Sequence, residues 1–175
     1  GNADSDFSTT LNLHGDGANL KNFLSNWKHF GVVQIESPVR LNRLDPESSF
    51  ITLTSQTNRF QRVPLPVLYK EPFESHLMIM AEVEHEFDPM LSLSPTSLLL
   101  EGLTFKGYPG VLLHMGKPDE PFHHEMMEHF MANVRKENPA ESLRLAQIEM
   151  ANKYPESIRW AEYRYFGFSG MSDDE

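Results

Sequence analysis

Acidic and imidazole side chains gather at the ends of three short apolar runs in this sequence. Glu36 and Ser37 follow VVQI at 32–35, and His114 ends GVLLH at 110–114. Within or just after HLMIMAEV at 76–83 come two more carboxylates and another imidazole. In open α/β sheets, ligands bind beyond the carboxyl ends of the strands, so these positions predict a cleft. The predicted cleft-lining residues are Glu36, Ser37, Glu82, Glu84, His85 and His114.

The chemistry of this predicted cleft has more than one interpretation. Crowded carboxylates raise one another's pKa unless a cation neutralises them. The set therefore fits an acidic groove for a basic peptide, or a metal site that combines the carboxylates with His85 or His114. A plainer interpretation also stays open, because strand alternation turns neighbouring side chains to opposite faces of a sheet. In that case the region is an ordinary solvated surface.

A second group of titratable residues is HHEMMEH at 123–129. His124 and Glu128 lie four positions apart, as do Glu125 and His129, so each pair shares a face of a helix. A zinc-protease helix needs two histidines four apart with a glutamate beside the first, and that spacing is absent here. We expect both pairs to be solvated, and we expect the chain to hold no metal and no cofactor.

Other catalytic classes are excluded or unsupported by residue type. The chain has no cysteine, which excludes a thiolate nucleophile, disulfides and cysteine-ligated metals. GYPG at 107–110 lacks the spacing and the Lys-Ser/Thr ending of a phosphate-binding loop, and the chain has no G-x-S-x-G elbow.

The charge of the chain is strongly acidic. Asp and Glu number 25 against 15 Lys and Arg, a net charge of −10. Such a surface repels phosphate, so we expect no nucleic-acid or membrane partner. A protein or basic peptide is the complementary partner, unless the charge serves solubility alone. No apolar run reaches the roughly 20 residues that span a bilayer. We expect a cytoplasmic protein, although a secretory signal could have been removed, and no oligomeric state is predicted.

The elements that must position these residues alternate between strands and helices. Helices are predicted at 18–29, from 94 to 107, at 122–134 and from Asn138 onward, where Asn-Pro-Ala-Glu is a helix start. Strands are predicted at 32–35 (ended by Pro38), 50–53, 76–83, 110–115 and 160–168, with 63–69 as a loop or short helix. This alternation predicts an α/β fold with a mostly parallel sheet between two helical layers.

The predicted organisation is a single domain at 17–168. Polar residues 1–16 are expected to be mobile, and residues 169–175 form an acidic tail.

Several segments resemble the CHAT domain, a caspase-like peptidase relative akin to the separase catalytic domain. NPAESLRLAQIEM at 138–150 is similar to the family's S-P-A-E-A-L-R-x-A-Q helix, and KYPESIRWAEYRYFGF at 153–168 to its closing strand. TSLLLEGLTFKGYPGVLLHMGKPDEPFHHEMMEHFMANV at 96–134 resembles its helix, glycine, strand and long helix. The resemblance implies a caspase-like sheet, with the chain as the C-terminal part of a longer polypeptide.

The departures from the family concern its catalytic dyad. GVVQIESP at 31–38 resembles the strand that ends at the family's catalytic histidine, and HLMIMAEVEHE at 76–86 the strand that ends at its cysteine. These two positions hold Pro38 and Val83, which can neither accept a proton nor attack a carbonyl. The resemblance therefore implies a non-catalytic pseudo-peptidase domain that acts in protein interaction or regulation. A metal-dependent hydrolase and a purely structural domain stay open as alternatives.

Overall fold

The structure is a computed structural model of the chain. It describes residues 11, 13, 17–26, 30–42, 45, 48–54, 60–67, 77–85, 110–115, 117–134 and 138–167, and at positions 54, 84 and 85 it describes the backbone only. The helix predicted from 94 to 107 lies outside these residues, as do the predicted terminal segments apart from Leu11 and Leu13.

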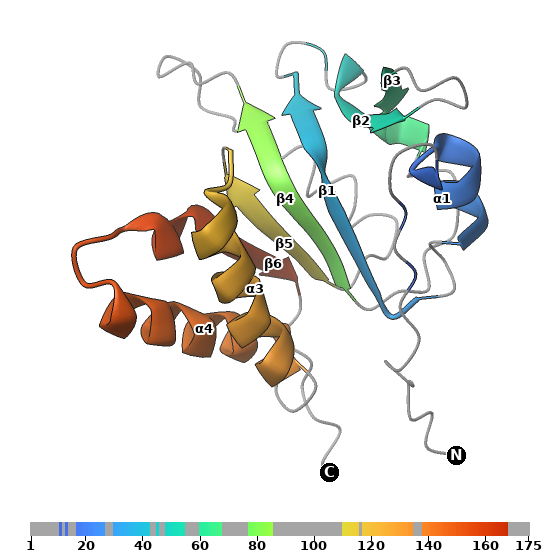
Figure 1. The fold of residues 1–175 in the computed structure, drawn as a ribbon. Helices are drawn as coiled ribbons and strands as arrows, with labels where there is room; N and C mark the ends of the chain where they lie inside the picture. Colours follow the sequence, from blue (N-terminus) through green and yellow to red (C-terminus); the bar gives the residue numbers. More distant parts are fainter. Residues whose placement is uncertain are drawn as a thin grey trace, which may run out of the picture.

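A mixed six-stranded sheet is the centre of the fold (Figure 1). Its order is β3-β2-β1-β4-β5-β6. In chain order the strands are β1 (Val32–Leu41), β2 (Phe50–Thr54), β3 (Phe60–Pro64), β4 (Leu77–His85), β5 (Gly110–Met115) and β6 (Tyr163–Gly167). Parallel pairing is confined to β1 with β4 and β4 with β5, whereas the other three pairings are antiparallel. The α/β class is confirmed, but the prediction of a mostly parallel sheet was wrong. Short connections join β1, β2 and β3 as antiparallel neighbours.

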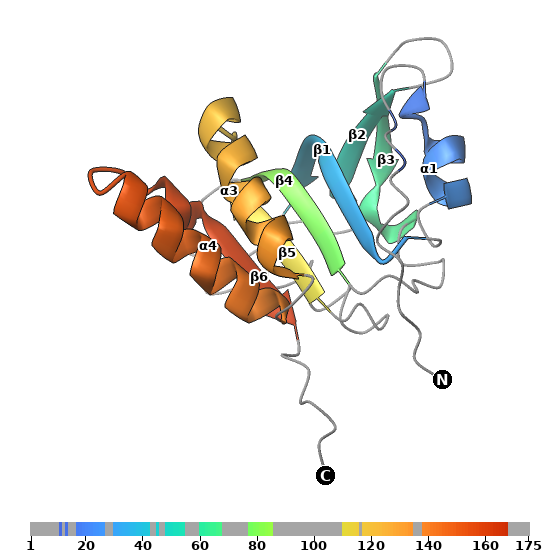
Figure 2. The ribbon, with the colours of Figure 1, turned by 60° about the horizontal axis from the view of Figure 1, so that its bottom comes forward.

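Helices cover both faces of this sheet. Met78 and Met80 of β4 pack with Phe23 of α1 (Leu20–Asn26) in one apolar cluster. Leu77 and Ile79 point the other way, into a cluster formed with α3 (Glu120–Val134) and α4 (Pro139–Lys153). Both ribbon views show α3 beside α4 at the β5 and β6 end of the sheet, with α1 near β2 and β3 (Figures 1 and 2). The alternation of β4 therefore produces the two apolar layers that the sequence predicted.

Several predicted elements are confirmed where the structure describes them. The helix at 18–29 is observed as α1, and the strands at 50–53, 76–83 and 110–115 as β2, β4 and β5. The predicted start of α4 is also confirmed, because the Asn138 side chain accepts a hydrogen bond from the Glu141 amide at 2.9 Å. None of the helices in the described ranges is both long and apolar enough to cross a membrane.

The prediction that Pro38 ends the first strand was wrong, because β1 runs on to Leu41. Residues 63–69 were predicted as a loop or short helix rather than a central strand. A 3-10 turn, η4 (Leu65–Val67), is found there, and Val63 and Pro64 are the last residues of β3, which is an edge strand. Proline lacks a backbone N–H, and sheets tolerate it at bulges and on edge strands, which are the positions found here. The predicted last strand is also shorter, since its start is a 3-10 turn, η5 (Arg159–Glu162).

The pairing of β1 with β4 contains one irregularity that matters for the site. Ile35 pairs with Met80, but the next recorded pair is Pro38 with Glu82, so three steps on β1 face two on β4. One extra residue of this kind is a β-bulge, which re-aims the side chains around it.

Candidate functional site

A cavity of about 320 Å³ lies beside the bulge, on the face of the sheet that α3 covers. Ile79 of β4 points to this face, and Glu82, three residues later, lines the cavity on the same face. Strict alternation would turn Glu82 away from Ile79, but the alternation of β4 breaks between Met80 and Val83, which both pack on the α1 side, next to the irregular pairing with β1. The cavity is lined by Gln34, Glu36, Glu82, Lys117, Pro118, Glu120, His123, His124 and Met127.

Glu36 of β1 is held from both sides by polar neighbours. Its Oε1 accepts a hydrogen bond from the Gln34 side chain, and its Oε2 lies 3.5 Å from Nε2 of His123. The contact with His123 is the main cause that lowers the pKa of Glu36, with Gln34 adding to it and partial burial opposing it. Glu36 is therefore a carboxylate at neutral pH, with its side chain 55% exposed.

His123 of α3 is the most deeply buried polar residue of the cavity wall, at 5% exposure. Its Nδ1 lies 2.8 Å from the Tyr163 hydroxyl. Burial raises the pKa of Tyr163, with Glu162 and Glu36 adding to the shift, so the phenol keeps its proton and can donate it to Nδ1. Nε2 has no well-aligned hydrogen bond within the described part of the chain. The 3.5 Å contact with Glu36 is therefore an electrostatic one.

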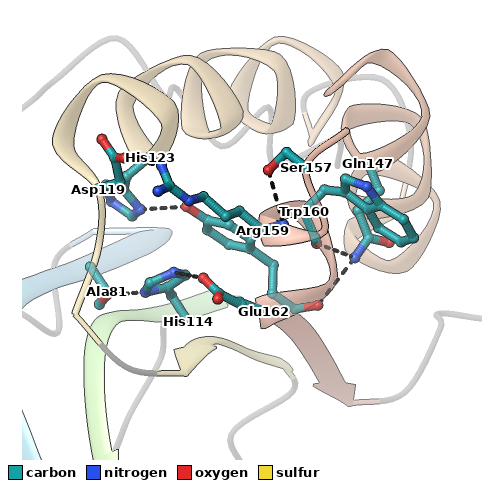
Figure 3. A network of polar contacts seen from close by, with 10 residues as sticks. Ala81, His114, Asp119, His123, Gln147, Ser157, Arg159, Trp160 and Glu162 are labelled. Carbon is teal, nitrogen blue, oxygen red and sulfur yellow. Dashed lines mark hydrogen bonds and ion pairs between the residues drawn. The ribbon is translucent and has the colours of Figure 1, made fainter. Parts of the chain in front are cut away.

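His114 forms the second half of this polar network (Figure 3) and does not line the cavity. Its Nδ1 lies 2.9 Å from the carbonyl oxygen of Ala81, and its Nε2 lies 3.2 Å from Oε2 of Glu162. The two imidazole rings are direct neighbours, with centroids 5.6 Å apart, and the ring of Tyr163 packs against both, with its centroid 4.6 Å from that of His114 and 5.8 Å from that of His123. Both nitrogens of His114 are thus engaged by neighbours and are not available to a ligand.

The turn that carries Glu162 and Tyr163 is fixed by its own contacts. The Gln147 side chain of α4 donates to the backbone carbonyls of Trp160 and Tyr163, at 3.0 and 3.1 Å. Arg159 pairs with Asp119, just before α3 (Figure 3). These contacts tie η5 and β6 to the two helices, so the network is held by four elements of the fold rather than by one loop.

Some predicted cleft residues meet in the cavity and others do not. Glu36 and Glu82 line it, whereas Ser37 is half-buried and does not. His114 is buried at 3% exposure and is part of the polar network, and it does not line the cavity. Glu84 and His85 belong to β4, but their side chains lie outside the described atoms.

The positions aligned with the family's dyad lie next to each other. Pro38 pairs with Glu82, and Val39 with Val83, so the two positions are one step apart on neighbouring parallel strands. Val83, however, is 1% exposed and packs in the cluster on the α1 side of the sheet. The acidic cavity is therefore not built around Val83.

His123, Tyr163 and Glu120 were not predicted from the sequence as site residues. His123 has a signal that could have identified it, because Met126, Met127 and Phe130 follow it at steps of three, four and seven. These are the buried positions of α3. The spacing argument selected the two exposed pairs of this helix instead, at 3.2 Å for His124 with Glu128 and 3.7 Å for His129 with Glu125.

The charges of the cavity favour a cation. Three carboxylates (Glu36, Glu82 and Glu120) face it, against the ammonium group of Lys117 and two imidazoles. In the part of the chain that the structure describes, no group of three or more His, Asp and Glu side chains has the spacing of a metal site. Comparison of the chain with protein-family models, curated proteins and solved structures gives no match.

Proposed function

We propose that this chain is a non-catalytic, CHAT-like domain that binds a basic segment of a protein partner. The observation that carries the proposal is the convergence of Glu36, Glu82 and Glu120 on one cavity of an acidic chain. A cavity with one sign of charge attracts ligands of the other sign and speeds their association. The lowered pKa of Glu36 keeps at least one of these carboxylates ionised well below neutral pH.

The strand register supports the relationship to caspase-like peptidases. The resemblance needs its two dyad positions on neighbouring parallel strands, and Pro38 and Val83 meet that condition. Neither residue carries a nucleophile or a base, which a cysteine peptidase requires. Binding without hydrolysis is the activity that this combination favours.

The test compares short fluorescent peptides that differ only in charge. We expect a peptide rich in lysine and arginine to bind, a glutamate-rich peptide of equal length not to bind, and neither to be cleaved. Replacement of Glu36 and Glu82 together by glutamine should weaken binding at least about tenfold, or about 1.4 kcal/mol.

The matched control replaces Glu149 and Glu156 together, which removes the same charge from exposed positions outside the cavity. This control should bind within about twofold of the wild type, since rim charges contribute little to affinity. Equal losses of affinity in the two double variants would show that binding depends only on the net charge of the chain, and would refute the proposal. Cleavage of either peptide, seen by mass spectrometry and abolished by a single substitution, would refute the non-catalytic assignment.

A further inference from the structure

The size of the cavity limits what it can hold. Pockets for small ligands measure roughly 300–1,000 Å³, and this one, at about 320 Å³, is at the lower end. An extended peptide does not fit in such a volume, whereas the end of one side chain does. The cavity is therefore a subsite for a single group.

The arrangement of the acceptors favours a compact cation over a planar one. One oxygen of Glu36 already accepts from Gln34, which leaves Oε2, 3.5 Å from Nε2 of His123, as the acceptor for a ligand. A guanidinium group binds best as a two-point fork on both oxygens of one carboxylate. An ammonium group is a point charge with three donors and can take single oxygens from separate carboxylates. Glu36 and Glu82 offer that arrangement from neighbouring strands.

His123 supplies an independent observation at the same place. Its ring is buried, its Nε2 has no hydrogen-bond partner among the described residues, and the carboxylate nearest to that atom is Glu36 at 3.5 Å. A proton added to this imidazole would place a full positive charge against the oxygen that a bound cation would use. The histidine is thus an internal competitor for the cavity's ligand.

We propose that the cavity binds one primary ammonium group through Glu36 and Glu82, in competition with a proton on His123. This inference rests on the proposed function and specifies its ligand. The ammonium group can belong to a lysine side chain of a partner or to a free alkylamine, and the chemistry at the site is the same for both.

Competition of this kind makes binding depend on pH. Protonation of His123 opposes the ligand, so affinity should rise with pH, with a limit of about tenfold per pH unit for one linked proton. The carboxylate of Glu36 stays ionised near neutral pH, since its pKa is lowered. Among the described residues, the other titratable groups that face His123 or line the cavity are Glu82, His114, Lys117, Glu120, His124, Glu162 and Tyr163.

Lys117 gives an internal check on the ligand class. Lys117 lines the same cavity, and its side chain carries the kind of charge that we assign to the ligand. Replacement of Lys117 by methionine removes this second competitor while keeping a side chain of similar length. The variant should bind an external ammonium group a few-fold more tightly.

The first experiment varies the ligand and follows binding by NMR titration of the whole chain. The probes are a blocked Gly-Lys-Gly peptide, the same peptide acetylated on the lysine nitrogen, its arginine counterpart, and n-pentylammonium. We expect the lysine peptide to bind at least about tenfold more tightly than its acetylated form, because acetylation removes the charge. Arginine should bind more weakly than lysine. Binding of n-pentylammonium as tight as that of the peptide would assign the site to free amines, and weaker binding to a lysine of a partner.

The second experiment varies pH with the lysine peptide from about pH 5.5 to 7.5. Wild-type affinity should rise with pH, and His123→Gln should keep the affinity of the upper end of the range while losing the slope. His129→Gln is the matched control, since His129 is on the same helix outside the cavity. It should keep the slope. Thermal unfolding of each variant shows that it is folded.

The outcomes separate this inference from the proposed function. Equal binding of lysine, acetyl-lysine and arginine peptides would overturn the ammonium subsite and leave the binding of longer basic segments standing. An unchanged slope in folded His123→Gln would overturn the competition with the proton. Absence of binding for every basic peptide, short and long, would overturn the inference and the proposed function together.

Discussion

In the part of the chain that the structure describes, histidine–carboxylate contacts occur in two regions, which differ in burial and in the sequence distance between the partners. On the outer side of α3, His124 pairs with Glu128 and His129 with Glu125, each within one helix. Beneath the same helix, His114 contacts Glu162, which lies 48 positions later in the sequence. His123 meets Glu36 across the junction of α3 and the sheet.

The difference shows that burial and tertiary position give such a contact its importance. Exposed ion pairs contribute about 0–1 kcal/mol, because solvent screens them and each side chain loses freedom. A buried polar group left without its partner costs about 1–3 kcal/mol. The inner set also has further partners, a backbone carbonyl for His114 and a phenol for His123. Equivalent substitutions in the buried set and in the exposed set should therefore lower the free energy of unfolding by different amounts.

The largest effect is expected for His114→Ala. The substitution leaves the Ala81 carbonyl without its donor and opens a cavity beneath Tyr163, which should lower the free energy of unfolding by about 2–4 kcal/mol. His129→Ala, on the exposed side of α3, should change it by less than about 0.5 kcal/mol. Urea unfolding measures both. Equal losses would mean that the two regions do not differ in energy.

Tyr163→Phe should have the next largest effect. Removal of the hydroxyl leaves Nδ1 of His123 without its partner in the buried network, at a cost of about 1–2 kcal/mol. Tyr154→Phe is the matched control, because the Tyr154 hydroxyl donates to Glu125 at 2.7 Å from an exposed position. It should cost less than about 0.5 kcal/mol. A control that loses as much stability as Tyr163→Phe would contradict the comparison.

A smaller effect is expected for Glu36→Gln, and it should depend on pH. The pKa of Glu36 is lower in the folded chain than its ordinary value of 4.5, so its ionised form stabilises the fold above that value. This contribution is lost as pH falls through the lowered pKa. At neutral pH the free energy of unfolding of the wild type should exceed that of the variant by less than about 1 kcal/mol, and this difference should disappear in the acid range.

Thermal unfolding of wild type and Glu36→Gln across pH measures this difference. Glu128→Gln, whose partner is the exposed His124, serves as the control and should show little pH-dependent difference. A constant gap between wild type and Glu36→Gln at all pH values would contradict the assignment of the shift to the contact with His123.

The smallest effect is expected for the outer pair itself. His124→Gln should change the free energy of unfolding by less than about 0.5 kcal/mol at low salt, and the change should vanish at high salt. Unfolding measured at two ionic strengths tests this. A salt-independent loss would show that the outer pair is stabilised by more than exposed electrostatics.

The sequence predicted the elements better than it predicted the site. Met126 and Phe130 fall at regular helical steps, and Asn138 begins α4 as its residue type indicates. The cleft residues Glu36 and Glu82 could be selected because each is near the end of an apolar run. The irregularity that brings Glu82 to the face of Glu36 could not be predicted, because it depends on the pairing of two strands separated by most of the first half of the domain.

The partners of His123 and His114 could not be predicted from a sequence pattern either, because they also depend on the pairing of strands that are distant in the sequence. Tyr163 and Glu162 come from the last turn and strand, where antiparallel pairing of β6 with β5 brings Tyr163 opposite His114. A spacing rule identifies contacts within one helix only, such as His124 with Glu128. It therefore finds the exposed pairs first and misses the buried ones.

The additional residue between Ile35 and Pro38 offers a way to classify related chains. Ile35 and Val39 pack in the same apolar cluster, four residues apart on β1, so removal of Ser37 would turn Val39 and Leu41 to the opposite face of the sheet. A homologue one residue shorter at this point is thus expected to need other side chains after Pro38 to fill that cluster. The length of this short segment, read from an alignment together with the residues at positions 39 and 41, would show whether a related chain keeps the irregular pairing.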